Sequence, residues 1–264
     1  MKDLQPDLGA VIWDMGLPER RTLLQPEYKQ QRDEMPHEMR AQLDYIQRQL
    51  VPLLGFKSLG LPNTEADDLI ATYALEAAAK GIEVVIATND KDLFQLVTDR
   101  IKIYSTNKTD LAAPGDSYAL LDSDCVRAKW GVLPHQIGEV LSLTGDSADN
   151  IPGVSGLGPK TAVSLLLEHG GLDGLLQNLD SVKSERIRGQ LKISLEMIAQ
   201  NREMVKLDLD LPLPVAVDGL QIQPCYRELV EAIEYCEFKS LLEEIKKEIP
   251  RSNPAPAKMQ GELF

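Results

Sequence analysis

The sequence has little cysteine, and it has no long run of apolar residues. Its three cysteines, Cys125, Cys225 and Cys236, form no CxxC pair and no zinc-ligand spacing. So few cysteines, in an odd number, are typical of a protein in the reducing cytoplasm, which is the expected location. No apolar stretch approaches the ~18 residues of a membrane span. The residues after Met1 are polar, which disfavours a signal peptide.

Positive charge is also scarce, because 28 Lys and Arg face 41 Asp and Glu and leave a formal net charge of -13. This balance argues against a protein that binds nucleic acid through bulk positive charge. It does not exclude a nuclease whose acids hold divalent cations, because a bound metal reverses the local sign of the charge. The 264 residues suit one large α/β domain, or one domain with a smaller appendage.

Strand and helix patterns alternate in the first part of the chain. Strands are expected at 9–14, 83–87 and 101–104, and helices at 65–80 and 90–97. Thr64 is expected to cap the first of these helices, with Asp67 as the capping-box acid. The alternation predicts an α/β fold with a mainly parallel central sheet and helices on both faces.

Three regions follow from composition and pattern. Residues 1–121 are expected to form the α/β domain, and residues 122–249 a helical region that ends in a helix over 226–249. Residues 250–264 are rich in proline, alanine and serine, and we expect a flexible tail there.

Acidic residues gather at positions that this fold brings together. Asp14 ends the first strand, and Asp90 and Asp92 follow the strand at 83–87. The carboxyl ends of parallel strands lie at one rim of a sheet, so these acids should lie close together. Further acids come in two groups, Glu65, Asp67 and Asp68, and then Asp146 and Asp149. Glu65 and Asp68 are three residues apart, as are Asp146 and Asp149, whereas Asp67 points elsewhere on an ideal helix. Each group alone has an ordinary explanation, such as helix-dipole or capping interactions.

Taken together, the acids predict a metal site. Two carboxylates about 4 Å apart repel by roughly 4 kcal/mol at an effective dielectric near 20. Such a cluster persists if its members are protonated or hold cations. Oxygen-only ligands select hard ions, so we expect Mg²⁺ or Mn²⁺. Two such ions are suited to phosphodiester hydrolysis, since one activates water and the other stabilises the leaving oxygen.

Three motifs carry a resemblance to a known family. In chain order they are EADDLIATYA (65–74), TNDKDLFQLV (88–97) and TGDSADNIPGVSGLGPKTA (144–162). They resemble the 5′-nuclease family, which includes the 5′→3′ exonuclease domain of bacterial DNA polymerase I, phage 5′ exonucleases and flap endonucleases. The resemblance runs from about residue 9 to about residue 249. It implies a resolvase-like nuclease domain with a helix–hairpin–helix subdomain, and structure-selective 5′→3′ exonuclease and 5′-flap endonuclease activity in primer removal and repair.

The resemblance assigns roles at the matched positions. It implies that two or three Mg²⁺ or Mn²⁺ ions are held by the acids Asp14, Glu65, Asp67, Asp68, Asp90, Asp92, Asp146 and Asp149. It places a helical arch at about 18–45, with a pattern of Arg21, Tyr28, Lys29 and Arg32 at its base. Lys29, near the scissile phosphate, and Arg21 would be catalytic. Tyr28 and Arg32 would contact the DNA.

The glycine-rich segment after Asp149 predicts a turn followed by a helix that starts near Pro159. Backbone N–H groups at that helix start, with Lys160 and Thr161, can hold a DNA phosphate. The resemblance implies a hairpin turn, built on Gly153, Gly156 and Gly158, that grips duplex DNA and binds K⁺ through its carbonyls. The segment also approaches a P-loop, but Pro159 is one residue too many for that motif.

The two ends of the sequence carry the remaining expectations. The family begins with a strand ending in an acid, some fifty residues before the strand matching 9–14, and no counterpart is found here. Either Met1 is internal to a longer reading frame, or the chain is a catalytically weakened, non-cleaving module that binds DNA junctions. At the other end, Gln260, Leu263 and Phe264 belong to QGELF, which resembles the sliding-clamp-binding pentapeptide of bacteria. The sliding clamp is therefore an expected partner.

Overall fold

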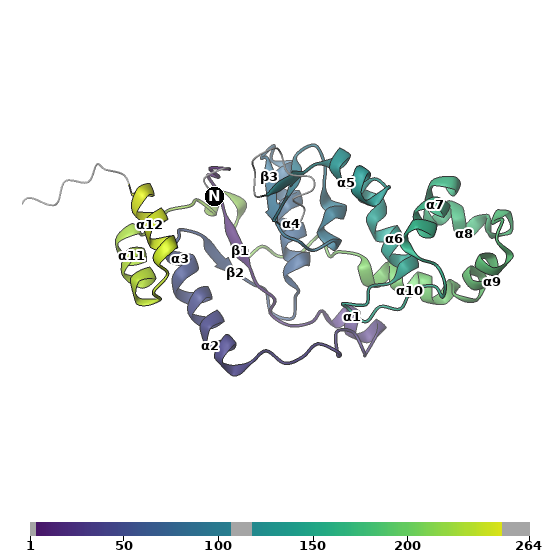
Figure 1. Ribbon diagram of the computed structural model, residues 1–264, viewed down its shortest axis with the longest axis horizontal. Helices are drawn as coiled ribbons and strands as arrows, with labels where there is room; N and C mark the ends of the chain where they lie inside the picture. The colour runs from purple at the N-terminus through teal and green to yellow at the C-terminus, as the bar shows by residue number, and fades with distance from the viewer. Residues whose placement is uncertain (1–3, 107–117, 250–264) are drawn as a thin grey trace, which may run out of the picture. The chain divides into compact units, whose positions relative to one another are not determined.

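The computed structural model describes residues 4–106 and 118–249. The chain divides into two compact units (Figure 1). One consists of Met1–Val11, Met35–Ser58 and Leu220–Phe264, and the other of Ile12–Glu34 and Leu59–Gly219. The boundary expected between residues 121 and 122 lies inside the second unit, so that division of the chain stays a prediction.

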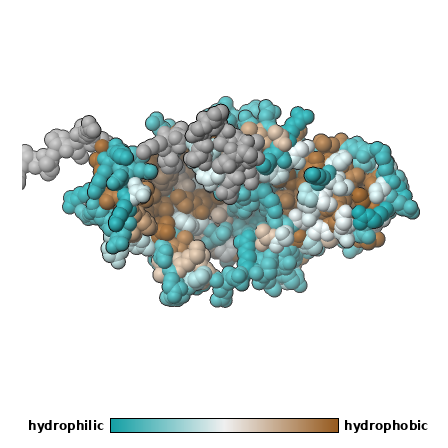
Figure 2. All heavy atoms as spheres, viewed as in Figure 1, coloured by the Kyte–Doolittle hydropathy of each residue, from teal (hydrophilic) through white to brown (hydrophobic). Residues whose placement is uncertain are grey.

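The first unit is mostly helical. Its helices are α2 (His37–Tyr45), the π-helix η1 (Ile46–Leu50), α3 (Val51–Leu53), α11 (Tyr226–Tyr235) and α12 (Lys239–Glu248). Leu50, Leu229, Ile233 and Ile245 form its core. In Figure 2 hydrophilic residues cover the face of α11 and α12 that is turned to the viewer, as expected for helices that pack their apolar residues inward.

One helix was expected over 226–249, and the structure has two helices there. The break falls at Glu237, whose φ of 56° is in the left-handed region. The N–H of Phe238 then donates to the carbonyl of Ile233 at 3.2 Å, which satisfies a carbonyl at the end of α11. The apolar pattern alone did not reveal this break, because both helices keep their apolar side toward the same core.

The second unit contains a three-stranded sheet. Its strands are β3 (Val84–Ala87), β4 (Ile101–Ser105) and β5 (Ala119–Leu121), in the order β3-β4-β5. The pair β3 and β4 is parallel, whereas β5 joins β4 antiparallel. A separate two-stranded sheet, most of which belongs to the first unit, pairs β1 (Ala10–Ile12) with β2 (Lys57–Leu59). The predicted alternation of strands and helices is confirmed, with an antiparallel strand added at one edge, but the strand expected at 9–14 forms β1 and does not join the sheet of β3 and β4.

The rest of the second unit is mostly helical. Its α-helices are α1 (Glu19–Leu24), α4 (Ala66–Ala79), α5 (Ser123–Trp130), α6 (Ile137–Thr144), α7 (Pro159–His169), α8 (Leu172–Gln177), α9 (Glu185–Ile193) and α10 (Leu195–Val205). Short 3₁₀ helices are η2 (Asp92–Leu96), η4 (Pro134–Gln136), η5 (Leu179–Ser181) and η6 (Val217–Gly219). Side chains from the sheet, η2, α6 and α7 share one core, in which Phe94, Ile101, Ile103, Leu143 and Leu166 are fully buried. Within the described ranges, no helix is long and apolar enough to cross a membrane.

The start of α4 differs from the expected one. Its N-cap residue is Glu65, and no side chain of its own forms the cap. The hydroxyl of Thr64 instead donates to the carbonyl of Pro62, and Asp14 Oδ1 accepts the N–H of Ala66 at 2.7 Å. The acid at the end of the first predicted strand therefore supplies the cap from a distance of 52 residues in the sequence. This contact fixes the end of that strand to the helix that carries Asp67.

The predicted helix–turn–helix is present between α6 and α7. The first helix ends at Gly145, and α7 begins at Pro159, as predicted. Gly153 lies against the end of α6 so closely that a Cβ there would be 2.0 Å from the carbonyl oxygen of Thr144. Gly156 has a φ of 71°, which few residues with a side chain adopt. The turn thus depends on the close backbone contact at Gly153 and on the left-handed conformation at Gly156.

Candidate metal centre and nucleic-acid interface

The loop after α6 carries Asp146 and Asp149 in a fixed conformation. Asp146 and Ile151 exchange two backbone hydrogen bonds of 2.8 Å, which closes the loop into a tight turn. Asn150 has a φ of 60°, a conformation that asparagine tolerates better than most residues. Both aspartates are buried, with exposed fractions of 6% and 9%. The hydrogen-bonded turn therefore holds the two carboxylates in fixed positions.

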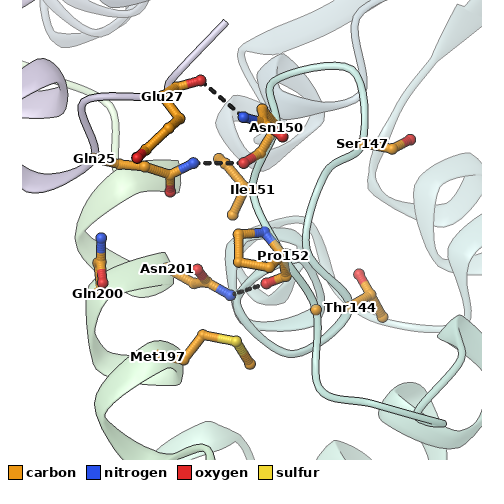
Figure 3. Close-up of a pocket in the computed structure, with 11 residues that line it drawn as sticks. Gln25, Glu27, Thr144, Ser147, Asn150, Ile151, Pro152, Met197, Gln200 and Asn201 are labelled. Carbon is orange, nitrogen blue, oxygen red and sulfur yellow. Dashed lines mark hydrogen bonds between the residues drawn. The ribbon is translucent and has the colours of Figure 1, made fainter. Parts of the chain in front are cut away.

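Amide side chains brace this loop from behind (Figure 3). Gln25 donates to the carbonyl of Asn150, and Asn150 donates to the carbonyl of Glu27 at 2.8 Å. The buried Asn201 of α10 donates to the carbonyls of Pro152, at 2.7 Å, and Ser142, at 3.1 Å. The side chains line a cavity of about 650 Å³. These amides bind backbone carbonyls of the loop. We therefore interpret the residues that line this cavity as a support for the loop conformation.

Three carboxylates meet in front of the loop. Asp92, Asp146 and Asp149 each offer an oxygen, and these oxygens lie within 4.8 Å of one another. Asp92 Oδ1 is buried and has no hydrogen-bond partner among the residues that the structure describes. A buried carboxylate oxygen without a partner is costly, and a bound cation would satisfy it. The donor set contains oxygen only, so these residues fit a hard divalent ion such as Mg²⁺ or Mn²⁺.

Other predicted acids act on this cluster through their charge. Burial, followed by the charge of Asp90, raises the pKa of Asp92 to about 7. Burial and Asp90 raise the pKa of Asp67 to about 7 as well, and Asp14 and Glu65 add to that shift. Asp90 Oδ1 also accepts the N–H of Asp92 at 3.1 Å. The structure thus gathers the acids at 14, 65, 67 and 90 within electrostatic range of one another or of the three-carboxylate cluster.

Asp68 lies outside the cluster. It is fully buried, and its oxygens accept from the Arg21 guanidinium at 2.6 and 2.8 Å and from the N–H of Asp208 at 2.9 Å. Arg21 also donates to Glu65 and to the carbonyl of Met204. Arg21 is only 3% exposed. These contacts give Arg21 and Asp68 a structural role, joining α1, α4 and the end of α10. The catalytic role expected for Arg21 and the metal-binding role expected for Asp68 stay predictions, because these contacts are formed in the absence of metal and DNA.

The remaining residues of the expected arch pattern all contact acids. Tyr28 is 4% exposed, and its hydroxyl lies 3.1 Å from Glu65 Oε1 and 3.2 Å from Asp149 Oδ2. Lys29 pairs with Glu65 and lies 3.5 Å from Asp149 Oδ2. Arg32 donates to Asp149 Oδ1 at 2.6 Å. Lys29 and Arg32 thus lie beside Asp149 of the cluster, and Tyr28 is buried among the acids.

The charge of Lys29 is secure in this environment. Burial opposes its ionisation, but the hydrogen bond and charge of Glu65 and the charge of Asp149 outweigh that effect, so the pKa of Lys29 lies above its usual value. The carboxylates hold the ammonium in its charged form. It is the form that can pair with a phosphate oxygen.

Sequence reasoning missed Lys91 as a member of the site. Its ammonium Nζ lies 2.8 Å from Asp146 Oδ2, and its side chain is 40% exposed. The position of this lysine between Asp90 and Asp92 was the available signal. Lys91 lies between two acids in the sequence. When these acids come close to Asp146, the lysine comes close to it as well and can pair with its carboxylate.

The predicted duplex-binding residues lie at the surface. Lys160 is exposed in the first turn of α7, and Thr161 follows it with its N–H bound to the carbonyl of Gly158 at 3.0 Å. Arg186 of α9 lies over the turn, 3.5 Å from the carbonyl oxygen of Gly156. The predicted clamp-binding residues Gln260, Leu263 and Phe264 lie outside the described residues.

An α/β unit that gathers carboxylates, followed in the chain by a helix–turn–helix, is the arrangement to be expected of a nuclease. Two family models match the chain accordingly. The model for the N-terminal resolvase-like domain of 5′-3′ exonucleases matches residues 1–131. The model for the C-terminal SAM fold of 5′-3′ exonucleases matches residues 132–228. The chain belongs to the 5′-3′ exonuclease family.

Individual proteins agree with this assignment. The chain is 32% identical over 248 residues to a 5′-3′ exonuclease of Aquifex aeolicus, covering 94% of this chain and 81% of the relative. It is 40% identical over 235 residues to the thermostable DNA polymerase I of Thermus thermophilus, covering 89% of this chain and 27% of the relative. The chain thus spans about a quarter of the length of that polymerase.

A solved structure supports the fold. The bacteriophage T5 flap endonuclease, in a pseudo-enzyme-product complex with DNA and metal ions, aligns with a TM-score of 0.66 and 22% identity. The alignment covers 94% of this chain and 85% of that one. The similarity extends across the α/β part and the helical part.

Replacing Arg21 tests its structural role. We expect Arg21→Ala to lower the free energy of unfolding by about 3–5 kcal/mol, because Glu65 and Asp68 would be left buried without their cation. Arg32→Ala is the matched control, since it removes the same charge from a side chain that is 51% exposed, and should cost about 1 kcal/mol or less. Urea unfolding measures both, and equal losses would contradict the assigned role.

The raised pKa values of Asp67 and Asp92 predict a dependence of stability on pH. Between the ordinary pKa of 3.8 and about 7 the unfolded chain has released these protons while the folded chain retains them. Stability in EDTA should therefore fall as the pH rises from about 4 to about 7, and this contribution should level off above that range.

Urea unfolding at pH 5, 6, 7 and 8 measures the decline. Asp92→Asn should reduce its slope, and Asp99→Asn, at an exposed position in the same region, should not. Identical slopes for the two variants would show that Asp92 does not titrate in this range.

Proposed function

We propose that this chain is a structure-selective 5′→3′ exonuclease and 5′-flap endonuclease, acting in DNA primer removal and repair with two or more Mg²⁺ or Mn²⁺ ions. One observation supports this proposal above the others. Asp92, Asp146 and Asp149 place oxygens within 4.8 Å of one another, and Asp92 Oδ1 has no hydrogen-bond partner among the described residues, in a chain of the 5′-3′ exonuclease family. Such a site suits metal-assisted hydrolysis of a phosphodiester.

The acids divide between two groups of candidate ligands. Asp92, Asp146 and Asp149 would hold one divalent ion, and Asp67 and Asp90, with Asp14 and Glu65 near them, are the candidates for further ions. When bound, the ions would supply a hydroxide nucleophile at neutral pH and stabilise the charge on the leaving oxygen. No side-chain nucleophile is needed in this chemistry.

The cations beside the cluster would position the scissile phosphate. Lys29 is held at Glu65 and near Asp149, and Arg32 at Asp149, at the edge of the cluster. A phosphate entering there would replace a carboxylate oxygen as the partner of the ammonium. Charge-assisted contacts of this kind stabilise the negative charge that the phosphoryl oxygens carry in the transition state.

The hairpin between α6 and α7 would hold the duplex. The exposed Lys160 and the N–H groups at the start of α7 form a small phosphate-binding surface on a chain whose net charge is -13. Carbonyls of the turn at 153–158 would bind K⁺, as the resemblance implies. Local contacts of this type position a duplex without reading its sequence.

A non-cleaving DNA-junction-binding module is the second candidate. It is favoured by the internal cations, because Lys29, Arg32 and Lys91 already compensate the buried acids without a metal. The two candidates differ in one outcome. A nuclease cleaves a labelled 5′ flap when Mg²⁺ or Mn²⁺ is added, whereas the binding module retains the flap intact.

The C-terminal QGELF suggests a protein partner. A Leu-Phe pair on a tether can enter an apolar groove of another protein. We propose that Gln260, Leu263 and Phe264 bind the bacterial sliding clamp, which would bring the nuclease to primer junctions. The support for this partner is the sequence of the segment.

The cleavage assay with an Asp146 variant tests the nuclease proposal. Asp146→Ala should lower the rate of 5′-flap cleavage by more than about a hundredfold, because a carboxylate of the cluster is lost, and should leave DNA binding no weaker. Asp99→Ala, an exposed acid outside the cluster, should cleave at the wild-type rate. Wild-type protein that binds the flap tightly and leaves it uncut in saturating Mn²⁺ would overturn the nuclease proposal in favour of the binding module.

A second assay tests the hairpin. Lys160→Ala should weaken binding to flap DNA, and it should reduce the slope of log affinity against log salt by about one, as expected for one lost phosphate contact. Lys80→Ala removes an equal charge at a site paired with Glu76 and should leave the slope unchanged. Fluorescence anisotropy at several KCl concentrations measures both slopes, and equal slopes would remove Lys160 from the interface.

A further inference from the structure

Lys91 pairs with one particular oxygen of the three-carboxylate cluster, Asp146 Oδ2. Asp146 Oδ1 is already bound by the N–H of Ala148 at 3.0 Å. The other oxygen, Oδ2, lies 2.8 Å from the Lys91 ammonium. The Asp146 side chain is 7% exposed and the Lys91 side chain 40% exposed. The lysine therefore pairs, from the solvent side, with the oxygen that the backbone leaves available.

A single ammonium compensates the cluster only in part. Three carboxylates meet there, and Asp92 Oδ1 remains without a partner. The other nearby cations are bound elsewhere, since Lys29 is held mainly by Glu65 and Arg32 by Asp149 Oδ1. Lys91 is thus the cation that stands directly at Asp146.

A divalent ion held by Asp92, Asp146 and Asp149 would compete with Lys91 for Asp146. The ammonium and the ion are both positive, so they repel each other when they share one carboxylate. The ammonium would have to leave Asp146 when the metal enters. The partial exposure of Lys91 gives it solvent into which to move.

We propose that Lys91 is an internal counter-cation that competes with the divalent metal for Asp146, and so stabilises the metal-free site and sets its metal affinity. The inference rests on the metal site of the proposed function. Lys91 acts on metal binding through Asp146, which makes it a positioning residue for the site.

Metal binding to the full-length chain tests this role without any cleavage. The protein is stripped with EDTA and titrated with Mn²⁺, and free Mn²⁺ is measured by electron paramagnetic resonance. Lys91→Gln should bind Mn²⁺ roughly three- to tenfold more tightly than wild type, because the competing charge is gone. Without metal, Lys91→Gln should also have a lower Tm than wild type, and it should gain more in Tm from Mn²⁺.

Two further variants test whether the change in Mn²⁺ affinity depends on the charge of residue 91 or on the loss of any lysine side chain. Lys91→Arg keeps the cation, and we expect wild-type affinity. Lys80→Gln is the matched control, because Lys80 is 38% exposed and pairs with Glu76 at 3.0 Å, so it loses the same charge and a similar ion pair outside the cluster. Its Mn²⁺ affinity should stay within about twofold of wild type.

The outcomes are distinct. Tighter Mn²⁺ binding by Lys91→Gln alone supports the proposal. Equal affinities for Lys91→Gln and Lys80→Gln, weaker binding by Lys91→Gln, or tighter binding by Lys91→Arg each overturn it while leaving the metal site intact. Wild-type protein that binds no Mn²⁺ removes the metal site itself, and with it the proposed function.

Discussion

Repulsion between carboxylates is the constraint on which this structure depends. Asp92, Asp146 and Asp149 place oxygens within 4.8 Å of one another in a buried setting, and Asp67 and Asp90 add their charge nearby. Such an arrangement is unfavourable unless protons or cations compensate it. Both forms of compensation are visible, since Asp67 and Asp92 have pKa values raised to about 7 and basic side chains approach the other acids.

The second unit is organised around that compensation. Residues 21–32 bring cations to the acids: Arg21 closes the buried pair of Glu65 and Asp68, and Lys29 and Arg32 reach Asp149. The amide side chains of Gln25 and Asn201 bind backbone carbonyls of the loop that carries Asp146 and Asp149, which limits the movement of these two acids. The fold therefore maintains a site that is electrostatically strained without metal. Such strain favours uptake of a divalent ion, and it is consistent with the metal-assisted chemistry proposed for this member of the 5′-3′ exonuclease family.

Local sequence patterns predicted most of the secondary structure, and the contacts that they did not predict are tertiary ones. Alternating strands and helices, and a helix beginning at Pro159, follow from periodicity and proline geometry, which depend on near neighbours. The rule that parallel strands end at one rim does not account for the gathering of the acids, because β1, which precedes Asp14, lies outside the sheet of β3 and β4. Spacing could not show that Arg21 binds Asp68, that Asp14 caps α4, or that Lys91 binds Asp146. These contacts join residues 47, 52 and 55 positions apart, and only tertiary packing decides them. The left-handed turn at Glu237 was missed because no glycine or asparagine marks it.

A crystal soaked in Mn²⁺ and measured at the manganese absorption edge tests the central claim most directly. The account predicts an anomalous peak between the carboxylates of Asp92, Asp146 and Asp149, with the Lys91 ammonium moved away from Asp146. A crystal that shows no peak at these carboxylates in saturating Mn²⁺, with Lys91 still paired to Asp146, would contradict it.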